Sequence, residues 1–226
     1  MSEETQVLAL FPLNVVLFPG MKLPLHIFEP RYRLMIGRCL EQEQDFGVLM
    51  ARSTLGPESV TTAYTVGTSA RITHVKRLED GRMNIMTTGV ERFRVLQLVR
   101  TEPYIVGRIE PFPLEGEESP DVRQLAHRTG KRFVRYLRMV NEVLGSTIEL
   151  DVTPRDARSL AYLIATAMDI ALDEKQELLR TPELPALLAK EARFLNREEM
   201  LLSRMREAQE SNEGYFRALT QYLSLN

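Results

Sequence analysis

The residues best suited to bind a charged partner form a basic run between Asp121 and Glu142. No acidic residue interrupts its six members, which are Arg123, Arg128, Lys131, Arg132, Arg135 and Arg138. At 3.6 residues per turn, Arg128, Lys131 or Arg132, Arg135 and Arg138 share one helix face, opposite an apolar stripe. Such a face could bind phosphates or another anionic partner. The net charge of −2 favours a solvated face, balanced by acidic residues of segment 115–121 or of the last helix.

Motifs of nucleotide-binding and hydrolytic enzymes are absent from the sequence. The Gly130-Lys131 pair is followed by Arg132, and Leu125 stands where the first glycine of a phosphate-binding loop belongs. The patterns G-x-G-x-x-G, G-x-S-x-G and H-E-x-x-H do not occur. The potential zinc ligands are scattered along the chain, at Cys39, His26, His74 and His127. We therefore expect no catalytic residues, no metal and no cofactor, and we interpret Cys39 as a packed hydrophobic residue.

Glycine and proline divide the chain into two parts. Nine of 12 glycines and nine of 12 prolines lie in the first 120 residues, between short apolar runs at 7–11, 23–28, 46–51, 70–75, 84–88, 93–99 and 104–109. Short apolar runs separated by glycine and proline predict seven strands, with a turn at Asp80-Gly81 and one helix beginning near Pro30. The front half is therefore expected to form a compact, mostly antiparallel β barrel or sandwich.

The second half is predicted to be helical. The polar segment 115–120 is typical of a linker, which gives two domains, 1–118 and 119–226. A serine or threonine is followed by proline at Ser119-Pro120, Thr153-Pro154 and Thr181-Pro182, and each of these pairs predicts a helix start. A short helix is also expected over 173–180. Apolar stripes predict two amphipathic helices, lined by Val122, Thr129, Phe133, Tyr136, Leu137, Val140 and Leu144 and by Leu184, Leu187, Leu188, Leu195, Leu202 and Met205. The second stripe predicts a long C-terminal helix.

Several motifs resemble a known family. Residues 11–13 are Phe-Pro-Leu, residues 16–20 are Val-Leu-Phe-Pro-Gly, and residues 23–32 are Leu-Pro-Leu-His-Ile-Phe-Glu-Pro-Arg-Tyr. Segments 67–72, 89–95 and 103–104 continue the pattern as G-T-x-A-x-I, G-x-x-R-F-x-V and Pro-Tyr, and 160–168 and 172–179 look like the helices that follow. Together these segments resemble the amino-terminal domain of the Lon protease family, which is also present in cereblon.

The resemblance implies an α+β fold, a PUA-like β pseudo-barrel followed by an α-helical bundle. It also implies a non-catalytic module that recognises unfolded or degron-bearing polypeptides and has a protease or a chaperone as a candidate partner. The ATPase and protease motifs of the family do not occur in these 226 residues, so a standalone member without enzymatic activity is expected. The single cysteine and the lack of an export signal indicate a cytoplasmic protein with no membrane segment.

Two sets of residues are candidates for contact with partners. Apolar residues beside the Pro19-Gly20 turn and residues after Gly89 could form an adaptable apolar patch with a cationic edge, made of Phe18, Met21, Leu23, Val90 and Arg92. Phe28 and Tyr32 are expected to pack beneath the motif. The alternative is an RNA- or DNA-binding PUA-like module that uses the face of Arg128, Lys131, Arg132, Arg135 and Arg138.

Overall fold

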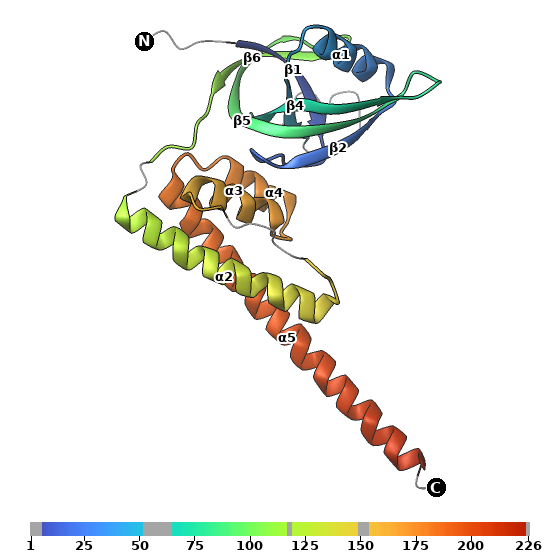
Figure 1. The fold of residues 1–226 in the computed structure, drawn as a ribbon, viewed down its shortest axis with the longest axis vertical. Helices are drawn as coiled ribbons and strands as arrows, with labels where there is room; N and C mark the ends of the chain where they lie inside the picture. Colours follow the sequence, from blue (N-terminus) through green and yellow to red (C-terminus); the bar gives the residue numbers. More distant parts are fainter. Residues whose placement is uncertain (1–5, 52–64, 117–118, 149–153, 225–226) are drawn as a thin grey trace.

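The front half of the chain is a closed six-stranded sheet (Figure 1). The computed structural model describes residues 6–51, 65–116, 119–148 and 154–224, with side chains described up to residue 210. The elements are β1 (Gln6–Leu13), β2 (Lys22–Ile27), α1 (Pro30–Glu41), β3 (Phe46–Met50), β4 (Val66–Arg77), β5 (Met83–Arg100) and β6 (Ile105–Pro111). The strand order is β2-β5-β4-β3-β1-β6, and a β5–β6 pairing closes the sheet. Only the β1–β3 pairing is parallel among the described strands.

Strand β5 corrects one prediction. Segments 84–88 and 93–99, expected as separate strands, belong to this single 18-residue strand, so the described sheet has six strands. Gly89 lies between the two segments and allows a close backbone approach. A Cβ atom at Gly89 would lie 2.2 Å from the carbonyl oxygen of Phe18, and the amide of Gly20 donates to the Gly89 carbonyl at 2.8 Å. This glycine therefore serves strand packing rather than a turn.

The second half consists of helices, as expected. They are α2 (Pro120–Leu144), α3 (Ala157–Ala167), α4 (Leu172–Leu179) and α5 (Leu184–Ser224). Helix α2 packs along α5, and α5 extends well beyond the other helices, so the predicted long C-terminal helix and the α+β class are confirmed (Figure 1). Within the described ranges, no helix has the length and hydropathy needed to cross a membrane.

The helix start predicted at Ser119-Pro120 is confirmed, whereas helices begin elsewhere than at the two Thr-Pro pairs. Ser119 caps α2, where its Oγ accepts a hydrogen bond from the amide of Val122 at 3.3 Å. Helix α3 instead begins at Ala157, capped by Asp156, and Thr153 lies outside the described residues. Thr181 also does not begin a helix. Its hydroxyl donates back to the carbonyl of Glu177 at 2.9 Å, which ties it to the end of α4.

A continuous apolar core joins the two halves. Val16, Phe18, Met50, Val66 and Leu114 of the β half pack in one cluster with the buried faces of the helices. The apolar members of both predicted helix stripes lie in this cluster, except for the last ones, Leu144 and Met205, which are exposed. Thr129, the polar member of the first stripe, is buried. A second cluster fills the barrel beneath α1 and includes Phe46 and Met35. The helices are therefore docked on one end of the barrel by burial of apolar surface.

Replacing Gly37 with alanine is expected to raise the free energy of unfolding by about 0.5–1 kcal/mol. Gly37 lies inside α1, and nothing lies within 4 Å of the position its Cβ would take. The gain comes from the higher helix propensity of alanine and should appear in urea unfolding followed by circular dichroism. Gly89→Ala is the contrasting variant, because its Cβ would meet a backbone carbonyl. A stability loss in Gly37→Ala would contradict the prediction.

Candidate functional site

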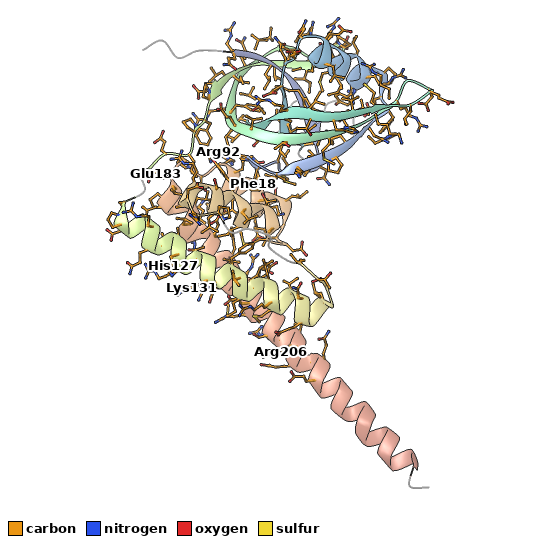
Figure 2. The ribbon with its side chains drawn as sticks, in the orientation of Figure 1. Phe18, Arg92, His127, Lys131, Glu183 and Arg206 are labelled. Carbon is orange, nitrogen blue, oxygen red and sulfur yellow. The ribbon has the colours of Figure 1, made fainter. Side chains whose placement is uncertain are left out.

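Arg92 lies at the junction between the barrel and the helices (Figure 2). The residue is 3% exposed. Its Nη1 donates to the main-chain carbonyls of Leu179, at 2.8 Å, and Thr181, at 2.7 Å. The guanidinium therefore supplies donors and positive charge at the C-terminal end of α4, where free carbonyls and the helix dipole favour a cation. Burial lowers its pKa.

Other main-chain contacts cross the same junction. Nε2 of Gln176 on α4 donates to the carbonyl of Val66 at 2.9 Å. The Glu115 amide donates to the carbonyl of Pro182, and the amide of Leu184 donates to the carbonyl of Glu115, both at 2.8 Å. The first residue of the predicted linker is thus fixed against the start of α5. These bonds set the orientation of the helices relative to the barrel.

The predicted apolar patch is mostly buried at this junction. Phe18 is 0% exposed and Leu23 9% exposed, so the expectation that they and Arg92 are accessible is wrong. The physical reason differs between the two residues. Phe18 packs in one cluster with the helical half, which covers this end of the barrel, whereas Leu23 packs in the cluster that fills the barrel beneath α1. Met21 and Val90 are half-buried. The amide of Gly89 donates to the Met21 carbonyl at 2.9 Å, so the two segments do lie together.

An accessible apolar surface instead lies at the other end of β2. Phe28 is 59% exposed and stacks on His26 with 6.0 Å between ring centroids. Two hollows adjoin these residues and share Leu25 and His26. One, of about 250 Å³, is also lined by Phe11, Phe28 and Tyr32, and the other, of about 430 Å³, is lined by Pro24 and Met86. We name Pro24, Leu25, His26, Phe28 and Met86 the Phe28 surface.

The wall behind Phe28 is aromatic. The rings of Phe11 and Tyr32 stack at 4.0 Å, and the guanidinium of Arg31 lies 4.6 Å from the Tyr32 centroid. Arg31 also pairs with Glu29 at 2.8 Å. Tyr32 is buried as expected, whereas Phe28 is not. The surface thus combines an exposed aromatic side chain with a preformed concave wall, the usual make-up of a binding site for apolar groups.

Strand alternation could have revealed Phe28. Leu23 and Ile27 of β2 are buried and Leu25 is half-buried, while Pro24 and His26 are exposed. Because successive side chains in a strand point to opposite faces, a residue that continues this alternation at position 28 faces outward. The motif resemblance points instead to the Pro19-Gly20 turn, at the other end of β2.

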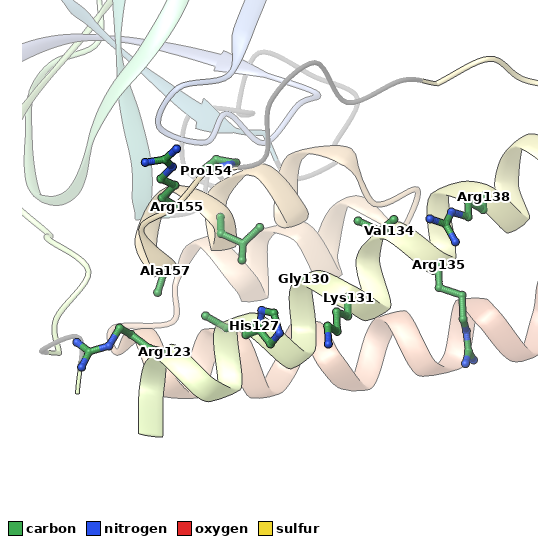
Figure 3. Close-up of a pocket in the computed structure, with 12 residues that line it drawn as sticks. Arg123, His127, Gly130, Lys131, Val134, Arg135, Arg138, Pro154, Arg155 and Ala157 are labelled. Carbon is green, nitrogen blue, oxygen red and sulfur yellow. The ribbon is translucent and has the colours of Figure 1, made fainter. Parts of the chain in front are cut away.

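The basic face of α2 divides between two environments. Nη1 of Arg132 donates to the carbonyl of Ala192 at 3.3 Å. Arg135 pairs with the buried carboxylate of Glu199, so an acidic residue of the last helix balances part of this charge, as expected. Arg128 is exposed. Lys131, Arg135 and Arg138 line a groove of about 770 Å³ between α2 and the start of α3 (Figure 3). We name this hollow the α2–α3 groove.

Cys39 is packed inside the barrel domain. Burial, helped by the nearby Asp45, raises the pKa of its thiol to about 11. The thiol is therefore protonated at neutral pH and unsuited to nucleophilic attack. Within the part of the chain that the structure describes, no three or more His, Cys, Asp or Glu side chains gather as they would around a metal ion.

Comparisons with known proteins give one family. The family described as "ATP-dependent protease La (LON) substrate-binding domain" matches residues 7–197. The chain is 31% identical over 199 residues to the Lon protease of Anaeromyxobacter dehalogenans and 30% identical over 200 residues to Lon protease 2 of Myxococcus xanthus. Each alignment covers 87% of this chain and 24% of the relative. The chain therefore spans about a quarter of the length of these proteases.

Solved structures of Lon N-terminal domains have the same fold. A Lon N-terminal domain protein from Xanthomonas campestris superposes with a TM-score of 0.59 at 24% identity, over 82% of this chain and 96% of the other. The N terminal domain of the Mycobacterium avium complex Lon protease gives a TM-score of 0.60 at 18% identity, over 84% and 98%. Because the family match covers most of the residues and both halves of the fold, the chain belongs to the Lon substrate-binding domain family.

Proposed function

We propose that this protein binds unfolded or degron-bearing polypeptides through the Phe28 surface. The observation that carries the proposal is the 59% exposure of Phe28, which lines one hollow beside the aromatic wall and lies next to a second hollow that shares Leu25 and His26. Substrate binding by the family, and the name Lon protease of the relatives, support a polypeptide as the ligand. A bound client would then be passed to a protease or a chaperone. The buried Cys39 suits a reducing compartment such as the cytoplasm.

The expected binding is weak and tolerant of sequence. An aromatic side chain buries roughly 150–250 Å² when fully covered. At about 25 cal/mol per Å², covering the exposed part of Phe28 contributes on the order of 2 kcal/mol. Met21 and Val90, at the opposite end of β2, offer a second, smaller contact because they remain half-accessible. A client therefore gains affinity from several apolar side chains rather than from one specific contact.

Replacing Phe28 with serine is expected to weaken binding of a labelled unfolded protein by about tenfold, because about 1.4 kcal/mol of apolar burial is lost. Fluorescence anisotropy with the whole protein measures the effect, and a folded sample of the same client is the reference ligand. Since Phe28 lies largely outside the core, the far-UV circular dichroism and the melting temperature should stay unchanged.

Leu96→Ser is the matched control, because Leu96 is also exposed, at 50%, but lies on β5 away from both hollows. It should bind the unfolded client as the parent does. Equal binding of folded and unfolded client, or an equal loss in the two variants, would exclude the Phe28 surface as the client site.

A further inference from the structure

The α2–α3 groove is the feature that the proposed function leaves unexplained. It runs along α2 and is closed by Pro154, Arg155, Ala157 and Leu160 on the side of α3. Figure 3 shows Arg123, His127, Lys131, Arg135 and Arg138 spaced along α2, with Pro154 and Arg155 across from them. Its volume of about 770 Å³ is within the range of sites that enclose a ligand.

Basic side chains dominate the rim of this groove. The lining contains Arg123, His127, Lys131, Arg135, Arg138 and Arg155, and none of the described lining residues is acidic. Arg135 is engaged by Glu199. Lys131, Arg138 and Arg155 form no ion pair with any described residue. Lys131 and Arg138 are seven residues apart on one helix, which separates them by about 10 Å along the same side.

The floor of the groove is apolar. Ala126, Gly130 and Val134 of α2 meet Ala157 and Leu160 of α3 there. At Gly130 the helices are in direct contact, because an added Cβ would lie 3.2 Å from a methyl carbon of Leu160. A ligand in this groove would therefore place an apolar group on the floor and negative charges against the rim.

This combination favours an acidic polypeptide over a nucleic acid. Single strands of RNA or DNA bind through base stacking on aromatic side chains, and the groove lining contains His127 but no Phe, Tyr or Trp. A phosphate backbone would also leave the apolar floor uncovered. We propose that the α2–α3 groove binds polypeptide segments in which aspartate or glutamate residues flank small apolar side chains. This site is separate from the Phe28 surface and adds a charge preference to client binding.

The test uses a short fluorescein-labelled peptide in which Glu and Asp alternate with Ala and Leu, and a matched peptide with Gln and Asn in their place. Anisotropy with the whole protein should show at least about tenfold tighter binding of the acidic peptide, decreasing with added salt. The double variant Lys131→Glu/Arg138→Glu should lose that preference. Arg108→Glu, an exposed residue of β6 outside the groove, is the control and should keep it.

Three results would overturn the groove site. They are equal binding of the two peptides, an equal loss in the control variant, and competition by single-stranded RNA or polyphosphate that removes the peptide at far lower concentration than unlabelled peptide does. The Phe28→Ser variant separates this proposal from the previous one, because it should still bind the acidic peptide fully. If Phe28→Ser binds the unfolded client as tightly as the parent does while the peptide preference is intact, the Phe28 surface alone is contradicted.

Discussion

Replacing Arg92 with alanine is expected to lower the free energy of unfolding by about 3 kcal/mol. The substitution removes both donors to the carbonyls of Leu179 and Thr181, which stay buried at the end of α4. It also removes the guanidinium that lies 4.7 Å from the Phe112 ring centroid. Nε and Nη2 of Arg92 have no described partner, so relief of their burial offsets part of the loss. Urea unfolding followed by circular dichroism measures the change.

Arg94→Ala is the matched control for this prediction. Arg94 lies two residues further along β5, also contacts the Phe112 ring, at 4.5 Å, and pairs with Glu110 at 2.8 Å on the surface. An exposed ion pair contributes little, so a loss below about 1 kcal/mol is expected. Arg92→Lys should fall between the two, because lysine keeps the charge but not the geometry of two donors. Similar losses for Arg92→Ala and Arg94→Ala would show that Arg92 does not stabilise the junction.

Replacing Glu191 with glutamine is expected to stabilise the protein by about 2 kcal/mol at neutral pH and by much less near pH 5. Glu191 is 0% exposed on α5, and neither carboxylate oxygen has a described hydrogen-bond partner. Burial raises its pKa well above the ordinary glutamate range. Above the ordinary pKa the unfolded chain has lost this proton while the folded protein keeps it. The parent therefore loses stability as pH rises through that window, and the glutamine variant does not.

Melting temperatures of the parent and Glu191→Gln across this pH range measure the difference. Glu199→Gln is the control, because this second buried glutamate of α5 is paired with Arg135. Neutralising it removes a charge-assisted contact and should destabilise by about 1 kcal/mol. A stability difference between the parent and Glu191→Gln that does not grow with pH would show that the pKa of Glu191 is not raised in the folded protein.

Much of the fold could be predicted because local pattern and global structure agree. The apolar runs at 46–51 and 104–109 became β3 and β6, Pro30 begins α1, and Ser119 caps α2. Errors arose where tertiary contacts decided the outcome. Gly89 is a close-approach residue inside β5, and the hydroxyl of Thr181 closes α4 instead of opening α5. Residue type alone does not separate these roles, since glycine suits both turns and close contacts.

The candidate site was harder to predict than the fold, because exposure depends on which face the helices cover. Phe18 and Phe28 both lie within two residues of a proline, yet Phe18 is buried beneath the helices and Phe28 is exposed. Arg92 was expected at the edge of a binding patch and instead joins the two halves. The alternation along β2 is the one pattern that distinguishes Phe28, because it places position 28 on the outward face.

The donors at the junction have a consequence for protein engineering. Arg92 and Gln176 bind the main-chain oxygens of residues 179, 181 and 66, and Glu115 and Leu184 pair through their backbones. Hydrogen bonding at the joint therefore does not depend on which side chains occupy the acceptor positions. A chimera that grafts the helices of a relative onto this barrel should keep its orientation if the arginine and glutamine donors and the apolar volume of the interface are retained. The proposed Phe28 surface, on the barrel, and the proposed α2–α3 groove, between the helices, could then be tested separately in such chimeras.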